Sequence, residues 1–225
     1  MARCAWGGGE TPALAGIIEA GRIELAAGCT GIANPKSRLT LGDALDAGDA
    51  IVLLASSGIH ANGLSLAREL AKRLPNGYLT PVRGEQSFGD ALLVPTLLYA
   101  PVTEALHHAG ITPHYAANIT GHGWRKLMRH AKALTYRIER LPPVPAVLDF
   151  IAHEAGMSDQ DAYGTFNMGA GFALFVAARD ALRTVDVARA CGIDAWVAGS
   201  VEAGPKRVVI EPLNFEFGSD TLHLR

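Results

Sequence analysis

The chain has 225 residues, 49% of them hydrophobic, and a formal net charge of −2, so it can form one large domain or one and a half small ones with buried cores. No segment approaches the roughly 20 apolar residues that span a bilayer, and the first residues lack the pattern of a secretory signal, which favours a cytoplasmic location and no membrane partner. The three widely spaced cysteines argue against a disulfide framework, and the balanced charges argue against a nucleic-acid partner.

Residues 1–46 differ from the rest of the chain. They contain the glycine-rich segment 7–11, one predicted strand at 23–32 and a polar turn at 34–36, which is too little to close a core alone. From about residue 47, strands and helices alternate in an orderly way. The sequence therefore predicts the tail of a first domain over 1–46 and a near-complete second domain over 47–225.

The elements of the second region follow from hydrophobic periodicity and turn signals. Residues 76–94 break this periodicity and are predicted to form a surface loop. Ser158 and Asp161 have the spacing of a helix capping box. The predicted elements are strand 50–55, helix 62–74, helix 96–109, strand 114–119, helix 123–131, strand 134–140, helix 145–155, a helical turn at 158–163, strand 171–177, helix 180–191 and a hairpin of strands 195–202 and 207–212.

The most informative segment is Ser-Ser-Gly-Ile-His-Ala-Asn-Gly at 56–63, between an apolar strand and an amphipathic helix. Free main-chain N–H groups and the positive end of the helix dipole favour an anion at such a junction. His60 and Asn62 add side-chain donors to them. The other residues of this segment that we predict to bind a substrate or phosphate are Ser56, Ser57, Gly58 and Gly63.

Two further polar, glycine-bearing segments adjoin predicted strands. Asn-Ile-Thr-Gly-His-Gly at 118–123 follows a strand and precedes a helix, and Thr-Phe-Asn-Met-Gly-Ala-Gly at 165–171 leads into an apolar strand. A tight turn and a strand-initiating bulge are the structural alternatives for these two segments. Their convergence in one chain favours ligand binding. The predicted binding residues are Thr120, Gly121, His122, Gly123, Asn167 and Gly169.

A fourth cluster, Gly-Gly-Gly-Glu-Thr at 7–11, places the carboxylate of Glu10 directly after a flexible turn. Carboxylates of this kind hold hard cations such as Mg²⁺ beside phosphate oxygens. The alternative is a frayed terminus, because chain ends are commonly poorly ordered.

In chain order, these four clusters resemble the aminoimidazole ribonucleotide synthetase family, also called phosphoribosylformylglycinamidine cyclo-ligase, and residues 194–201 resemble its closing strand. The resemblance implies an α+β fold, with a mixed sheet, helices and ferredoxin-like elements in a C-terminal domain at 47–225. Residues 1–46 would be a remnant of the N-terminal ATP-binding and dimerisation domain. It also implies a homodimer that uses ATP and Mg²⁺ to close the ring of formylglycinamidine ribonucleotide in purine biosynthesis.

The same resemblance implies roles for individual residues. Glu10 would be a Mg²⁺ or ligand carboxylate, and His60 and Asn62 would be catalytic residues facing the active cleft. Residues 120–123 would hold a phosphate of a small phosphorylated metabolite, and Asn167 would line the substrate side.

The chain departs from the family pattern in two ways. The stretch that usually precedes residue 8, with its acidic and glycine-rich ATP-binding motifs, is absent from this sequence. Asn118 and His122 stand where the family commonly has histidine and glycine, so the bound group can differ. Other ATP-using branches of the superfamily and a non-catalytic phosphometabolite-binding or assembly module are the alternatives to the cyclo-ligase.

Overall fold

The computed structural model describes residues 5, 7–9, 16–19, 21 and 25–222, and the chain forms two compact units, 1–39 and 40–225. In the first unit, the described residues contain the short 3₁₀ helix η1 (Lys36–Arg38). Residues 25–32 form no strand, so the strand predicted at 23–32 is wrong over its described part. The reason is the lack of a partner: the side chains of Leu25 and Ile32 are 90% and 94% exposed.

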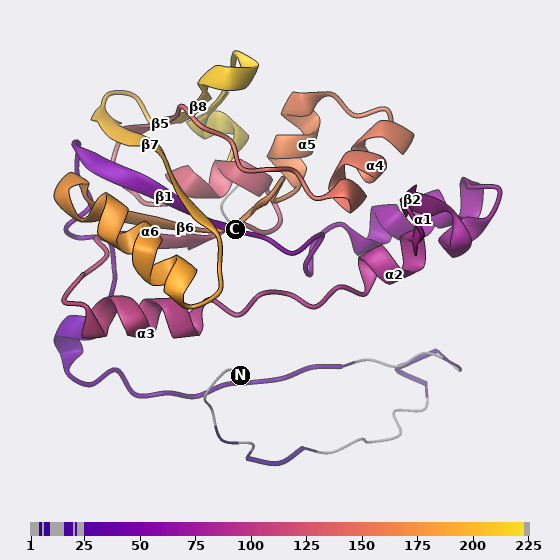
Figure 1. Ribbon diagram of the computed structural model, residues 1–225, viewed down its shortest axis with the longest axis horizontal. Coiled ribbons are helices and arrows are strands. Elements are labelled where there is room, and N and C mark those ends of the chain that lie inside the picture. The colour runs from indigo at the N-terminus through magenta and orange to yellow at the C-terminus, as the bar shows by residue number, and fades with distance from the viewer. Residues whose placement is uncertain (1–4, 6, 10–15, 20, 22–24, 223–225) are drawn as a thin grey trace. The chain divides into compact units, whose positions relative to one another are not determined.

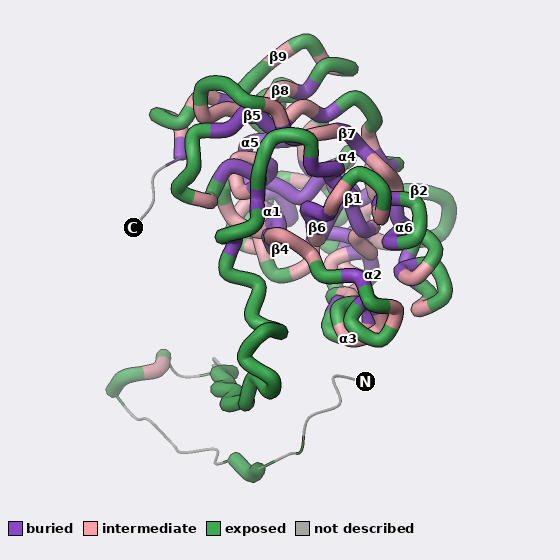
Figure 2. The backbone as a smooth tube through the Cα atoms, turned by 90° about the vertical axis from the view of Figure 1, so that its left-hand side faces the viewer, coloured by how far each residue is buried: buried purple, intermediate pink, exposed green. Residues whose placement is uncertain are grey.

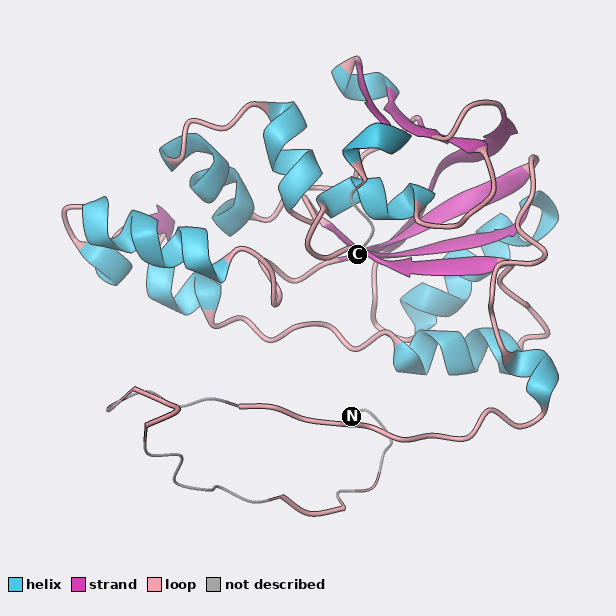
Figure 3. Ribbon diagram, turned by 180° about the vertical axis from the view of Figure 1, so that it is seen from behind, coloured by secondary structure: helices cyan, strands magenta, loops and turns pink. Residues whose placement is uncertain are grey.

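The second unit is built on a seven-stranded mixed sheet in the order β4-β6-β1-β7-β5-β8-β9 (Figures 1 and 3). Its neighbouring strands are antiparallel except for β5 and β8, which are parallel. The strands are β1 (Asp49–Ala55), β4 (Tyr115–Asn118), β5 (Leu134–Ile138), β6 (Ala170–Ala177), β7 (Ala195–Ala203), β8 (Arg207–Ile210) and β9 (Phe215–Gly218). A separate small hairpin pairs β2 (Pro81–Arg83) with β3 (Gln86–Ser87). The predicted α+β fold with a mixed sheet is confirmed.

Six α-helices and several 3₁₀ turns surround this sheet among the described residues of the second unit. The α-helices are α1 (Leu64–Arg73), α2 (Phe88–Leu92), α3 (Ala100–His108), α4 (Ala146–Glu154), α5 (Asp159–Thr165) and α6 (Ala181–Ala190). The 3₁₀ turns are η2 (Gly77–Leu79), η3 (Gly123–Met128), η4 (Ala178–Asp180), η5 (Glu211–Leu213) and η6 (Ser219–Thr221). The predicted capping box is confirmed at α5, where the Ser158 hydroxyl accepts a hydrogen bond from the Asp161 N–H at 3.2 Å.

Strand β1 is buried on both faces, which explains its uninterrupted apolar sequence. Successive side chains of a strand point to opposite faces. Ile51 and Leu53 belong to the core that η3, α1, α4 and α5 cover, whereas Ala50, Val52 and Leu54 pack toward α3 and α6. Figure 2 shows buried residues in the strands of the sheet and in the helices that cover it. The sheet therefore separates two hydrophobic cores.

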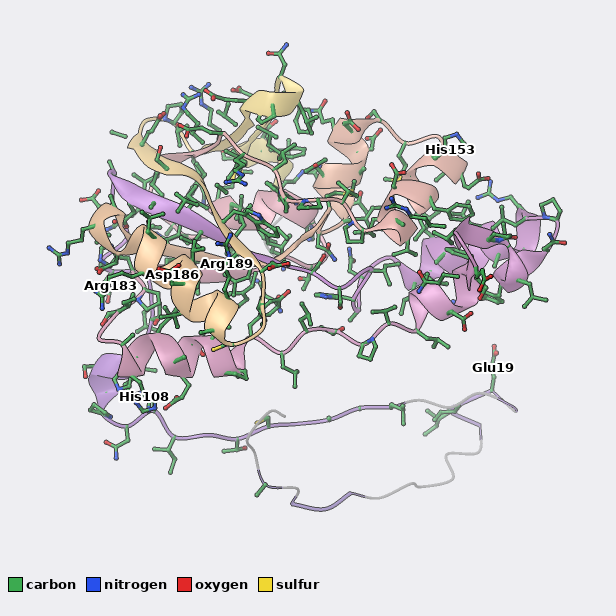
Figure 4. The ribbon with its side chains drawn as sticks, in the orientation of Figure 1. Glu19, His108, His153, Arg183, Asp186 and Arg189 are labelled. Atoms are coloured by element: carbon green, nitrogen blue, oxygen red, sulfur yellow. The ribbon has the colours of Figure 1, made fainter. Side chains whose placement is uncertain are left out.

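Helix α6 is tied to its surroundings by arginines as well as by apolar packing. Arg183, Asp186 and Arg189 lie along this helix (Figure 4). Arg183 donates a hydrogen bond to the Ala109 carbonyl at 2.8 Å, and Arg189 donates to the Ala195 carbonyl at 3.0 Å. The helix is thus linked to the turn after α3 and to the start of β7.

The predicted hairpin between residues 195–202 and 207–212 is wrong, although both strands exist. Strand β5 lies between β7 and β8, antiparallel to the first and parallel to the second. The turn at Gly204 and Pro205 crosses over β5, and the Thr135 hydroxyl donates a hydrogen bond to the Pro205 carbonyl at 2.8 Å. A local turn signal shows where a strand ends, whereas its neighbours in the sheet depend on distant residues.

One loop prediction and one helix prediction also need correction. Residues 76–94 are not a plain loop, because they contain η2, β2, β3 and α2, a five-residue helix that buries Phe88 and Ala91 and is capped by Ser87. The helix predicted at 123–131 is the shorter 3₁₀ helix η3, whose buried Trp124 and Leu127 have the three-residue spacing of such a helix. Strand β9 was not predicted. Among the described residues, no helix has the length and apolar character needed to cross a membrane.

Candidate functional site

Three of the predicted polar segments meet where the neighbouring strands β4, β6 and β1 end or begin, on one side of the sheet. We call them the β1 loop (56–63), the β4 loop (118–123) and the β6 loop (165–171). Strand β6 lies between β4 and β1 and is antiparallel to both. The ends of β4 and β1 therefore lie beside the beginning of β6. The topology alone brings together segments that are far apart in the sequence.

Asn167 joins the β1 and β6 loops through its buried side chain. Its Oδ1 accepts hydrogen bonds from the Ser56 hydroxyl at 2.7 Å and from the Gly169 N–H at 3.0 Å. Its Nδ2 donates to the Gly58 carbonyl at 2.8 Å. The side chain is 3% exposed, so these three bonds occupy it from within the protein.

Main-chain and indole hydrogen bonds complete this junction. The Ser56 N–H donates to the Gly169 carbonyl at 2.9 Å, and the Ile119 N–H donates to the Gly171 carbonyl at 3.0 Å. The Trp124 indole donates to the Asn167 carbonyl at 2.8 Å. The β6 loop thus holds the β1 loop on one side and the β4 loop with η3 on the other.

Asn62 makes a second link among the three loops. Its Nδ2 donates a hydrogen bond to the Thr165 carbonyl at 2.6 Å. A Cβ atom placed on Gly121 would lie 3.3 Å from Asn62 Oδ1, so the β4 loop passes close to this amide. The next residue is Gly63, where an added Cβ atom would collide with the Phe166 ring. Asn62 therefore lies where all three loops approach each other.

His60 is held inside the β1 loop through its ring. The Ser57 N–H donates to His60 Nε2 at 3.1 Å, and the Ser57 hydroxyl, also 3.1 Å from that nitrogen, donates to the Pro95 carbonyl at 2.6 Å. Because an N–H group can only donate, Nε2 is the acceptor and the neutral ring carries its proton on Nδ1. The ring also lies close to Gly171, where a Cβ would be 2.8 Å from His60 Cε1, and beside Tyr99.

Burial lowers the pKa of His60 below its ordinary value of 6.5. At pH values between the lowered pKa of His60 in the folded protein and its ordinary value of 6.5, the unfolded chain binds more protons than the folded one. The contribution of His60 to the free energy of unfolding therefore falls as the pH is lowered through 6.5. We expect His60→Gln, whose amide oxygen can still accept from Ser57, to remove this contribution. Urea unfolding between about pH 7.5 and pH 5.5 should then show a shallower pH dependence than in the unchanged protein.

The control is His107→Gln, because His107 is exposed on α3. His60→Gln should show a shallower pH dependence than this control. The lowered pKa of His130 is common to all three proteins and cancels in the comparison. Parallel curves for His60→Gln and His107→Gln would contradict the assigned state of the His60 ring.

Backbone strain is concentrated in these loops. Four described residues other than glycine have positive φ: His60 (57°), His122 (75°), Met168 (42°) and Asn214 (54°). The first three belong one each to the β1, β4 and β6 loops. Such conformations are uncommon for residues with a Cβ, and they cluster at functional sites in proteins generally.

The predicted site residues of 56–169 lie in the three loops, and the contacts between loops join Ser56, Gly58, Asn62, Gly121, Asn167 and Gly169. Thr120 and His122 lie in the β4 loop, half-buried and exposed respectively, and Gly169 is fixed by the approach of the Pro143 carbonyl. Glu10 lies outside the described residues. Sequence reasoning missed Lys126 of η3, whose Nζ donates to the Thr120 hydroxyl at 3.2 Å. Its position three residues after the glycines of the β4 loop was the available signal.

Comparison with known proteins agrees with this arrangement. Residues 46–211 match the family described as AIR synthase related protein, C-terminal domain. The phosphoribosylformylglycinamidine cyclo-ligase of Methanococcus vannielii is 36% identical over 200 residues, which cover 87% of this chain and 55% of the relative. That of Anaeromyxobacter dehalogenans is 36% identical over 210 residues, which cover 91% of this chain and 60% of the relative. The chain thus spans somewhat more than half the length of these relatives.

The fold is also found in distant proteins of known structure. The crystal structure of HypE from E. coli, a hydrogenase maturation protein, matches with a TM-score of 0.52 and 19% identity, covering 82% of this chain and 53% of that one. This likeness shows a shared fold. The match over 46–211 and the identity to the cyclo-ligases confirm the resemblance found in the sequence: the chain belongs to the AIR synthase related family and contains the C-terminal domain of that family.

Proposed function

We propose that this chain forms the substrate-binding part of an ATP-dependent cyclo-ligase, which closes the ring of formylglycinamidine ribonucleotide to give aminoimidazole ribonucleotide. The observation that carries the proposal is the meeting of the β1, β4 and β6 loops around Asn62 and Asn167, in a domain 36% identical to named cyclo-ligases. The proposed protein is a homodimer in the cytoplasm. Its partner is a small phosphorylated metabolite.

In the proposed reaction ATP would phosphorylate the amide oxygen of the substrate and so convert it into a leaving group. The neighbouring amine then attacks the amide carbon, the carbon–oxygen bond breaks and phosphate departs. This chemistry needs positioning and stabilisation of negative charge rather than a covalent nucleophile. Loops rich in main-chain N–H groups, held by the buried amide of Asn167 and the half-buried amide of Asn62, suit that requirement.

The contacts of individual residues support different roles within this proposal. Asn167 and His60 engage the protein itself, so we propose that they position the β1 loop. Asn62 links the β1 and β6 loops beside Gly121, and we propose that it aligns them against the substrate, which the β4 loop at Thr120 and Gly121 faces. Among the described residues, no group of three His, Cys, Asp or Glu side chains is placed to hold a metal ion. The proposed Mg²⁺ carboxylate, Glu10, lies outside the described residues, and we assign no step through the metal.

The test joins this chain to the N-terminal half of the Methanococcus vannielii cyclo-ligase. With Mg-ATP and formylglycinamidine ribonucleotide, the joined protein should form aminoimidazole ribonucleotide and release phosphate. Asn62→Ala should lower its kcat/KM about tenfold to a hundredfold, because the loops lose the link that aligns them. Asn76→Ala is the matched control, since Asn76 is exposed and makes no side-chain capping bond.

The alternative, a non-catalytic phosphometabolite-binding or assembly module, gives a different result. Calorimetric titration of the 225-residue chain would then show binding of formylglycinamidine ribonucleotide, and the folded joined protein would bind Mg-ATP and substrate without forming product. That outcome would overturn the cyclo-ligase proposal. Phosphate release that requires both ATP and the substrate would exclude the module.

A further inference from the structure

Lys126 occupies an unusual electrostatic position beside the β4 loop. It is half-buried in η3, and its ammonium donates to the Thr120 hydroxyl at 3.2 Å. Within residues 25–222, no carboxylate forms an ion pair with it. Burial, and secondarily the positive charge of Arg129, lower the pKa of Lys126. The ammonium thus faces a hydroxyl-bearing glycine loop without a counterion from the described protein.

The neighbouring cations are directed elsewhere. Arg125 donates to the Gly164 carbonyl at 2.9 Å and lies over the Phe217 ring, 4.9 Å from its centroid. Lys132 donates to the main-chain carbonyls of Asp43 and Leu45. Among these three cations, Lys126 is therefore the one that bonds the β4 loop.

The β4 loop itself has unused donors. In the described range 25–222, no acceptor receives the N–H groups of Gly121 or His122, whereas the Gly123 N–H bonds the Thr120 carbonyl at 2.8 Å. The Thr120 hydroxyl accepts from Lys126, which leaves its own proton free to be donated. Two main-chain donors, a hydroxyl and an ammonium thus occur within one short stretch of chain.

A ligand with several negatively charged oxygens matches this donor set. Charge-assisted hydrogen bonds from an ammonium to phosphate are about twice as strong as hydrogen bonds between neutral groups. A second positive charge at Arg129 strengthens the preference for a doubly charged anion. A phosphate monoester has that charge and enough oxygens to accept from every donor.

We propose that Lys126 is the phosphate-binding cation of this chain, which together with the Thr120 hydroxyl and the N–H groups of Gly121 and His122 binds a phosphate monoester at the β4 loop. The inference rests on the proposed function only for the identity of the substrate that carries the phosphate. Beyond the phosphate contact of residues 120–123 that the family resemblance implies, it adds the residue that supplies the charge.

The experiment titrates the 225-residue chain with inorganic phosphate and follows the amide resonances of Thr120, Gly121 and His122 by NMR. We expect saturable shifts, and Lys126→Gln should weaken binding by about tenfold, equivalent to about 1.4 kcal/mol. Lys126→Arg, which keeps the charge, should bind more tightly than Lys126→Gln. Lys72→Gln is the matched control, because Lys72 is exposed on α1 and pairs with Glu69.

A second readout needs no substitution. The side-chain Cε resonance of Lys126 in the unchanged chain should shift with the same phosphate dependence as the amides. Absence of saturable binding, equal weakening by Lys126→Gln and Lys72→Gln, or a Lys126 resonance that does not respond would each overturn the inference.

The outcome is separable from that of the proposed function. Phosphate binding that depends on Lys126, in a chain whose joined form closes no ring, would support this inference and overturn the cyclo-ligase. Ring closure by the joined protein, with phosphate binding that does not depend on Lys126, would support the cyclo-ligase and overturn this inference.

Discussion

Replacing Asn167 by alanine should lower the free energy of unfolding by about 3 kcal/mol or more, because it leaves several buried polar groups without partners. The amide accepts from the Ser56 hydroxyl and the Gly169 N–H and donates to the Gly58 carbonyl. At 3% exposure, water cannot replace these bonds without opening the loops. Urea unfolding measured by circular dichroism gives the difference from the unchanged protein.

Two further variants make the result specific. Asn76→Ala removes an exposed amide and should change stability by less than about 0.5 kcal/mol. Asn167→Asp keeps the oxygen that accepts from Ser56 but sets a carboxylate oxygen against the Gly58 carbonyl. Its destabilisation should decrease as the pH falls, because a protonated carboxyl can donate to that carbonyl. A loss at Asn167→Ala no larger than at Asn76→Ala would show that the amide does not hold the loops together.

The sequence of this protein predicts local structure better than it predicts which strands pair in the sheet. The continuous apolar run of β1 indicates a strand buried on both faces, and Ser158 with Asp161 marks the start of α5. Strand β5 between β7 and β8 could not be predicted, because pairing of residues such as Thr135 and Arg207 is decided by the whole fold. The five-residue helix α2 is too short to give a periodic signal.

The same division holds for the candidate site. Each loop is recognisable alone, since glycines and polar side chains at the end of a strand are a local pattern. The bonds that join the loops connect residues 111 and 109 positions apart, as between Asn167 and Ser56 or Gly58. The sequence also gives no indication that the Nε2 of His60 accepts a bond from its own loop, because that depends on the positive φ of His60 and the approach of Gly171.

The junction between the β4 loop and α5 makes a second strong prediction, at Gly123. The φ of Gly123 is +52°, and a Cβ there would collide with the Tyr163 carbonyl and lie 2.8 Å from main-chain atoms of Gly164 and Thr165. All these atoms belong to the backbone of α5, so no change of rotamer can relieve the contact. We expect Gly123→Ala to destabilise the protein by more than about 4 kcal/mol, at the extreme of single substitutions.

Gly110→Ala separates the two causes of this loss. Gly110 has φ of +70°, and a Cβ atom there would have nothing within 4 Å, so its substitution carries the left-handed strain without the collision. It should cost about 1–2 kcal/mol. The excess loss at Gly123→Ala then measures how tightly α5 holds the β4 loop. Equal losses at the two glycines would mean that α5 can move away, and the donors of Thr120 and Gly121 would no longer be fixed relative to Asn62.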